Sequence, residues 1–161
     1  MSSFLVQSVI SGVFATIVLD LWQRLLFAVA GIPPANWGLI GRWFAHMPRG
    51  RFVHDAIAEA EPVSGEAKIG WTLHYLIGIA YGLVYVGLIV HGLDSRPSLL
   101  NGFVFGLASV VIPWFLMQPA LGLGVMGRRT PKPWIPSLTA LANHCLYGVA
   151  LYLGAVLARG L

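Results

Sequence analysis

Four apolar stretches, each about as long as a bilayer is thick, dominate this sequence. The most regular of them runs from Gly70 to His91 and reads GWTLHYLIGIAYGLVYVGLIVH. At about 1.5 Å per residue, a helix of about 22 residues crosses the ~30 Å hydrocarbon core of a membrane. Composition agrees, because 57% of the 161 residues are hydrophobic and only 10% are charged, against about a quarter in soluble domains. The chain is therefore predicted to be an integral membrane protein.

The predicted spans are residues 4–30, 70–91, 98–122 and 136–158. We expect them to form an all-α bundle of four transmembrane helices. No linker or low-complexity run divides the chain, so residues 1–161 are expected to form a single domain. Small residues lie on one face of the first span, namely Ser8, Ser11, Gly12 and Ala15. Such a face allows a neighbouring helix to approach closely. Pro113 is expected to kink the third span.

Residues 35–66 form the longest polar section and are predicted to lie on the membrane surface. Apolar side chains recur there at helical spacing: Leu39, Ile40, Trp43, Phe44 and Met47. This pattern is typical of an amphipathic interfacial helix, whose polar face would show Arg42 and His46. A second short helical pattern covers residues 52–57. Several titratable residues follow no zinc-binding spacing and are expected on a solvated face: His46, His54, Asp55, Glu59 and Glu66.

Lysine and arginine are distributed unevenly about the predicted spans. Eight of the ten fall on the side of the two long loops: Arg24, Arg42, Arg49, Arg51, Lys68, Arg128, Arg129 and Lys132. Only Arg96 and Arg159 fall on the other side. The positive-inside tendency therefore places the long loops in the cytoplasm and both termini in the periplasm of a bacterial inner membrane. We expect Arg128, Arg129 and Lys132 to contact anionic lipids, and we expect no nucleic-acid binding.

Each predicted span carries a polar residue at a similar depth, roughly 5 to 10 Å inside its cytoplasmic end. These residues are Arg24, His74, Gln118 and His144. Asp20 lies about one turn deeper and is expected to pair with Arg24, four residues on. Intramembrane ionisable residues usually face the bundle interior and pair with one another. We therefore predict a polar pocket near the cytoplasmic face, completed by Tyr75, Trp114 and Asn143.

Three functional hypotheses remain open for this pocket. In the leading one, a small ligand such as a quinone, a lipid, a proton or a partner binds there. In the second, His74 and His144 ligate a haem b iron or a transition metal. In the third, the protein is an accessory subunit that docks a larger membrane complex through small-residue faces. Those faces are Gly12 with Ala15, and Gly102 with Gly106.

The alternative to the first two is that the two histidines form interhelical hydrogen bonds and only stabilise packing. The sequence contains no catalytic motif, so no catalytic residue is named and a non-enzymatic role is favoured. Four spans are few for a transporter that acts alone, and a homodimer fits any of these hypotheses. The motif H-x-x-x-G occurs at residues 74–78 and again at residues 144–148, which is compatible with two helical hairpins in a parallel repeat.

Five separated motifs cover nearly the whole chain. They are GRW at 41–43, RG-x-F-x-H at 49–54, GE-x-x-x-GWTLHY at 65–75, QP-x-x-G-x-G at 118–124 and L-x-x-H-x-x-YG at 141–148. With these motifs the sequence resembles the bacterial integral membrane family catalogued as domain of unknown function 2938. The resemblance implies a four-span inner-membrane protein and carries no established activity, cofactor or catalytic residue. The matching positions to mutate first are Glu66, His74, Gln118, Pro119 and His144.

Overall fold

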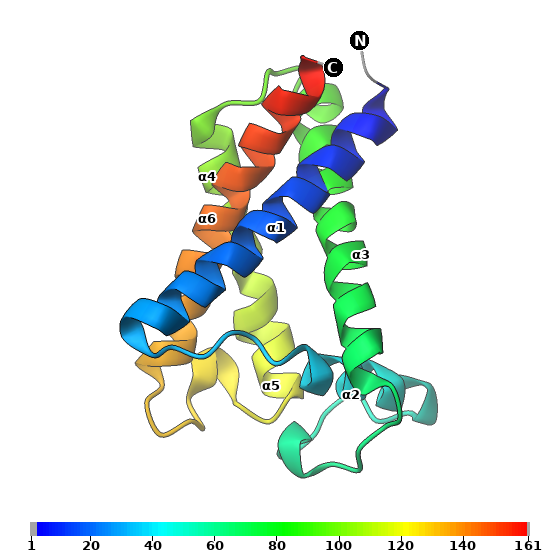
Figure 1. Cartoon of the computed structure of the whole chain (residues 1–161), viewed down its shortest axis with the longest axis vertical. Helices are drawn as coiled ribbons and strands as arrows, with labels where there is room; N and C mark the ends of the chain where they lie inside the picture. Colours follow the sequence, from blue (N-terminus) through cyan, green and yellow to red (C-terminus); the bar gives the residue numbers. More distant parts are fainter. Residues whose placement is uncertain (1–2, 161) are drawn as a thin grey trace. The chain divides into compact units, whose positions relative to one another are not determined.

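The computed structural model describes residues 3–160, and for Val90 and His91 only the backbone (Figure 1). The described residues form helices and connecting turns without a β-strand, which confirms the predicted all-α class. The α-helices are α1 (Phe4–Ala30), α2 (Trp37–His46), α3 (Glu66–Val86), α4 (Leu99–Ser109), α5 (Gln118–Ala120) and α6 (Trp134–Arg159). The 3-10 turns are η1 (Met47–Arg49), η2 (Ile57–Glu59) and η5 (Val125–Gly127). Two π-helical segments are η3 (Gly87–Gly92) and η4 (Pro113–Met117).

Among the residues that the structure describes, four helical stretches are long and apolar enough to cross a membrane, as predicted. They are Phe4–Ala30, Glu66–Ile89, Leu99–Ala120 and Trp134–Arg159. The second begins at Glu66, earlier than the predicted Gly70. Pro113 does disturb the third stretch, which passes from α4 into the π-helical segment η4. Proline lacks an N–H and its ring crowds the carbonyl one turn back, and a locally wider helix relieves that crowding.

The described chain is built from two compact units. Unit 1 contains Met1–Pro34, Tyr75–Ser109 and Asn143–Leu161, and unit 2 contains Ala35–His74 and Val110–Ala142. Unit 1 therefore holds α1, α4 and most of α3 and α6. Unit 2 holds α2, α5, the short 3-10 turns and η4. We describe each unit by itself.

In unit 1, α1 packs against α3 and α6 through the predicted small-residue face. Ser8, Ser11, Gly12 and Ala15 are all buried, which confirms that prediction. A Cβ atom added to Gly12 would collide with the carbonyl oxygen of Gly78 on α3. The first turn of α1 and the last turn of α6 lie at the same end, so these two helices are antiparallel (Figure 1). Glycine and serine thus allow the backbones to touch where a larger residue would hold them apart.

The second small-residue face is also used inside unit 1. A Cβ atom on Gly102 would lie 2.6 Å from the carbonyl oxygen of Gly148 on α6, and one on Gly106 would collide with the carbonyl oxygen of His144. Ala15 on the first face is fully buried. The expectation that these two faces dock a larger complex is therefore wrong, because helices of the same chain already cover them.

In unit 2, the predicted amphipathic helix forms as α2. Asn36 caps it, with its side-chain oxygen accepting a hydrogen bond from the backbone N–H of Leu39 at 3.2 Å. Close crossing with the start of α3 again depends on glycine, since a Cβ atom on Gly41 or Gly70 would collide with a backbone carbonyl oxygen. The core of unit 2 is formed by Trp43, Ile57, Ala120 and Leu121.

The second predicted helix of the interfacial section does not form. Residues 51–56 are not helical, and only Ile57–Glu59 makes a 3-10 turn. The backbone N–H of His54 donates instead to the carbonyl of Ala120 at 2.9 Å, and that of Ile57 to the carbonyl of Leu121 at 3.1 Å. These long-range hydrogen bonds keep the segment non-helical and attach it to the turn after α5. In a local helix, the same N–H groups would have bonded to carbonyl groups within the segment itself.

Candidate functional site

Arg42 is the most heavily bonded side chain of unit 2. Its guanidinium donates two hydrogen bonds of 2.8 Å to the two carboxylate oxygens of Glu66. Its Nη1 also donates to three carbonyl oxygens, those of Ile57, Ala58 and Ala60, at 3.2, 3.2 and 2.9 Å. The hydrogen bond to Glu66 raises the pKa of Arg42 further above its ordinary value. Arg42 therefore fastens the 57–60 segment to the start of α3, and we call this arrangement the Arg42 clasp.

The Arg42 clasp corrects two expectations. Arg42 was placed on the wet face of an interfacial helix, but its side chain is only 9% exposed. Glu66 was placed on a solvated face, but it forms the ion pair with Arg42. The physical reason is that residues 51–60 fold back over α2, and their carbonyl groups supply the acceptors that water would otherwise provide.

His46 and His54 form a second buried polar group in unit 2. They are 1% and 5% exposed, and Nδ1 of His46 lies 2.9 Å from Nε2 of His54. The two outer ring nitrogens, Nε2 of His46 and Nδ1 of His54, are buried without a hydrogen-bond partner among the described residues. Burial lowers the pKa of His54, and the nearby His46 and Arg51 add to this effect.

The predicted solvated face is therefore wrong for both histidines, although Asp55 and Glu59 are exposed as expected. Helical spacing places His46 on the polar side of α2, and nothing in the local pattern indicates that a later segment covers it. The only sequence signal was the place of His54 in the motif RG-x-F-x-H.

His74 also belongs to unit 2, where two tryptophans surround it. Its ring stacks on Trp37 with centroids 3.8 Å apart and planes inclined by 26°. Trp71 approaches edge-on, with ring centroids 5.6 Å apart. His74 is buried. Trp37 was not among the predicted site residues, because it lies far from His74 in the sequence.

Trp114 and Gln118 tie the end of the third candidate span to the start of α6. Nε1 of Trp114 donates to the carbonyl of Ser137 at 3.2 Å, and Nε2 of Gln118 donates to the carbonyl of Pro136 at 3.3 Å. The side-chain oxygen of Gln118 is buried and has no partner among the described residues. These contacts use the carbonyl groups of the first turn of α6, within unit 2.

Unit 1 has its own polar centre where α1, α3 and α6 cross. The hydroxyl of Tyr147 lies 3.3 Å from that of Thr16 and 3.2 Å from the carbonyl oxygen of Gly78. Thr16 donates to the carbonyl of Gly12 at 2.8 Å. Neither Thr16 nor Tyr147 was predicted as a site residue. Tyr147 lies in the motif L-x-x-H-x-x-YG, which was the only sequence signal for it.

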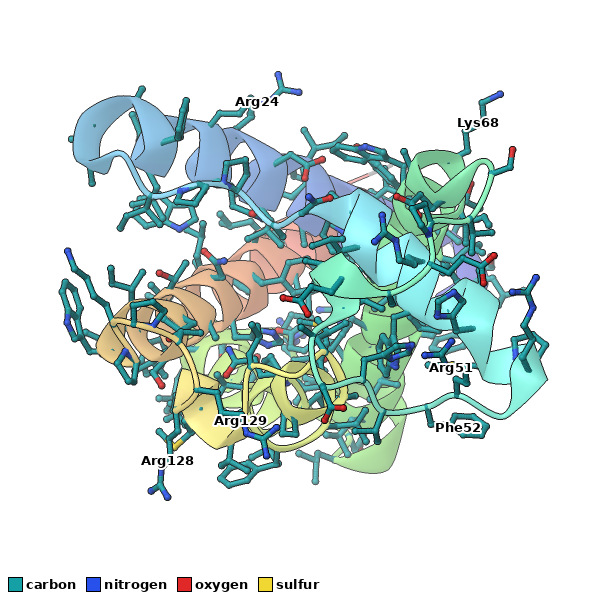
Figure 2. All side chains as sticks on the ribbon, turned by 90° about the horizontal axis from the view of Figure 1, so that it is seen from below. Arg24, Arg51, Phe52, Lys68, Arg128 and Arg129 are labelled. Atoms are coloured by element: carbon teal, nitrogen blue, oxygen red, sulfur yellow. The ribbon has the colours of Figure 1, made fainter. Side chains whose placement is uncertain are left out.

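One turn away from this crossing, the predicted residues of unit 1 form pairs. The hydroxyl of Tyr75 donates to the carboxylate of Asp20 at 3.2 Å. Nε1 of Trp22 donates to the side-chain oxygen of Asn143 at 3.0 Å. Arg24 is exposed and points away from the ribbon (Figure 2). The bond between Tyr75 and Asp20 links α3 to α1, and the pairing of Asp20 with Arg24 stays a prediction.

His144 makes the most informative contact of unit 1. Its Nδ1 lies 2.8 Å from the hydroxyl oxygen of Ser109, and that hydroxyl donates to the carbonyl of Gly106 at 2.7 Å. A serine hydroxyl has one hydrogen, so both contacts are satisfied only if Nδ1 of His144 carries the proton and donates it. Nε2 is then the bare, accepting nitrogen. The ring of Tyr81 lies beside the ring of His144, with ring centroids 6.2 Å apart.

The predicted site residues thus divide between the units. Unit 1 contains Asp20, Arg24, Tyr75, Asn143 and His144, and unit 2 contains His74, Trp114 and Gln118. Their gathering in one pocket stays a prediction. Within the part of the chain that the structure describes, no three side chains of the metal-ligating types come together.

The basic loop residues lie at the surface of unit 2. Arg128, Arg129 and Lys132 are all exposed. Figure 2 shows Arg128 extending away from the loop that carries it. Arg51 and Phe52 are exposed in the other long loop of this unit.

A comparison with protein families gives a match over almost the whole chain. The sequence profile described as "Protein of unknown function (DUF2938)" matches residues 9–158. The chain belongs to the DUF2938 family. This confirms the family resemblance, and the matched range includes all five motifs. No curated protein and no solved structure matches the chain. The family description names no activity, so the function of this DUF2938 protein has to be argued from its own residues.

Proposed function

We propose that the protein is a multi-pass protein of a bacterial inner membrane that binds a small, membrane-soluble ligand at an intramembrane site around His144. Its long loops face the cytoplasm and its termini the periplasm. The ligand is a lipophilic molecule with an O–H or N–H group, such as a hydroquinone or an alcohol. The chain acts by binding this molecule, without a catalytic step of its own.

One observation carries the proposal, which is the contact between Nδ1 of His144 and the hydroxyl of Ser109, from which we infer the tautomer of His144. Because Ser109 holds the proton on Nδ1, the nitrogen Nε2 accepts hydrogen bonds. A hydrogen-bond acceptor in a candidate membrane span is costly unless a donor meets it. The ring of Tyr81 adjoins His144, and its hydroxyl makes no hydrogen bond to the described part of the chain. A ligand hydroxyl that donates to Nε2 of His144 satisfies this acceptor, and the hydroxyl of the neighbouring Tyr81 is a second polar group that the ligand can meet.

A second candidate function rests on the same tautomer. Metal-binding histidines usually donate their other ring N–H to a protein oxygen, as His144 does to Ser109. Haem or a transition metal could bind Nε2 in the same position. We rank the transition metal second because the described residues do not provide a group of three metal ligands, and the absorption spectrum tests for haem, which needs only one or two axial histidines.

The test compares the gently solubilised wild-type protein with His144→Ala by mass spectrometry of organic extracts. We expect one lipophilic compound that is enriched in the wild type and absent from His144→Ala. Cys145→Ala, at the next position of α6, is the matched control and keeps the compound. Thermal unfolding of each variant shows that all three proteins are folded.

Equal compound levels in wild type and His144→Ala would refute ligand binding by His144. An absorption spectrum of the same samples decides between the candidates. A Soret band, or bound metal that disappears in His144→Ala, would replace the small-ligand proposal with the haem or metal one.

A further inference from the structure

On unit 2, several large apolar side chains are exposed close in sequence to basic residues. Phe52 and Val53 are 58% and 72% exposed, and they follow the exposed Arg51. Trp134 is 61% exposed and follows Lys132 by two residues. Exposed apolar and aromatic residues next to cations are typical of protein segments that lie at the lipid headgroups of a membrane.

The backbone near Phe52 is fixed, so its exposure is not the result of a loose loop. Nε1 of Trp43 donates to the carbonyl of Phe52 at 2.8 Å. The N–H of Arg51 donates to the carbonyl of His46 at 3.3 Å, and that of His54 to the carbonyl of Ala120 at 2.9 Å. These hydrogen bonds hold the segment in a conformation in which the side chain of Phe52 is exposed.

The second loop is fixed in the same way and belongs to the same unit. The N–H of Arg129 donates to the carbonyl of Leu123 at 2.9 Å, and that of Arg128 to the carbonyl of Val125 at 3.2 Å. The two loops are joined through the turn after α5, since Ile57 bonds to Leu121 across them. Both loops therefore contribute exposed side chains to the surface of one linked part of unit 2.

Charge on this unit favours a negatively charged partner. Its exposed cations are Arg49, Arg51, Lys68, Arg128, Arg129 and Lys132. Its exposed carboxylates are Asp55, Glu59 and Glu61. None of those cations is ion-paired in the described part of unit 2. Figure 2 shows Lys68 and Arg128 extending into open space.

We propose that this surface, formed by residues 49–53 and 128–134, binds the headgroups of anionic phospholipids. Position supports a lipid rather than a soluble partner. The candidate span α6 begins at Trp134, and Lys132 lies two residues before it. Lys68 lies in the first turn of α3. Residues at the ends of membrane spans lie at headgroup level, where tryptophan and basic side chains anchor a protein. The cations bind phosphate, while Phe52, Val53 and Trp134 insert among the acyl chains.

The experiment uses the whole purified protein in an uncharged detergent and measures lipid binding by native mass spectrometry. The probes are phosphatidylglycerol and phosphatidylcholine with identical acyl chains. We expect tighter binding of phosphatidylglycerol and a decrease with added salt. The triple variant R128Q/R129Q/K132Q should bind it about 100-fold more weakly, because each of the three basic residues contributes about fivefold to the binding constant near an anionic surface.

The matched control is R96Q/R159Q, which removes two exposed cations of unit 1. We expect wild-type binding for this control. The proposal is overturned if both lipids bind equally, if the triple variant keeps its preference, or if the control loses as much. A third probe, inorganic phosphate, separates lipid from soluble anion. If phosphate alone displaces phosphatidylglycerol at millimolar concentration, the site is one for a free anion and the lipid proposal fails.

Discussion

Replacing Arg42 by glutamine is expected to destabilise unit 2 strongly. The substitution leaves the Glu66 carboxylate, which is 22% exposed, without its cation. Removing one member of a buried ion pair costs about 3–5 kcal/mol, and the partial exposure of Glu66 places the estimate near 3 kcal/mol. The three carbonyl groups of residues 57–60 also lose their donor. Each costs up to about 1 kcal/mol where water cannot replace it.

The total of about 3–6 kcal/mol corresponds to a fall in Tm of roughly 10–20 °C for a chain of this size. Thermal unfolding in detergent measures the fall. Trypsin cleavage mapped by mass spectrometry locates it, because the clasp holds the segment that follows Arg51. Cleavage after Arg51 should become much faster in R42Q than in wild type.

Two further variants test the reasoning. R49Q removes an exposed cation of the same unit and should change stability by less than about 0.5 kcal/mol. The double variant R42M/E66M removes both charges and should be more stable than R42Q, because no stranded carboxylate remains. If R42Q unfolds within about 1 kcal/mol of wild type, or if R42M/E66M is no better than R42Q, the clasp does not act as described.

Two other predictions concern the histidine pair and the helix crossing. The pKa of His54 is lower in the folded protein than its ordinary value of 6.5, so the unfolded chain binds a proton more readily than the folded one. The contribution of His54 to the free energy of unfolding is therefore complete above pH 6.5 and is lost as the pH falls below that value. Thermal unfolding at pH 7.5 and 5.5 measures this loss. The variant H54Q keeps a hydrogen-bonding group near His46, and we expect its stability to differ less between the two pH values. A pH dependence equal to that of the wild type would contradict the role of His54. Gly12→Val should prevent close packing of α1 on Gly78 and lower stability by several kcal/mol, whereas Gly87→Ala meets only ordinary contacts; equal unfolding temperatures for the two variants would contradict the crossing.

The membrane helices were predictable because they depend on local information. A span needs only a run of apolar residues long enough to cross the bilayer, and its backbone groups bond within the helix itself. The small-residue face of α1 follows from helical spacing alone, and so does the position of Pro113. The glycine of the motif H-x-x-x-G has the same packing role in both copies, since Gly78 is in close contact with α1 and Gly148 is in close contact with α4.

The candidate site was predictable only in part. Asp20, Tyr75, Asn143 and His144 do make polar contacts within unit 1, as the rule for polar residues in spans indicates. Their partners could not be read from spacing, because Trp22 bonds to Asn143 across 121 residues and Ser109 to His144 across 35. The accepting nitrogen of His144 is fixed by a contact between helices.

Sequence alone therefore determined the four apolar helices that are long enough to cross a membrane, the amphipathic helix α2 and the family of the chain. Only the tertiary structure decided the environment of the interfacial section. It buried Arg42, His46 and His54, and it left Phe52 exposed. The reason is that amphipathic spacing assigns a residue to a face of its own helix, while a segment that folds back from elsewhere in the chain decides whether that face meets water.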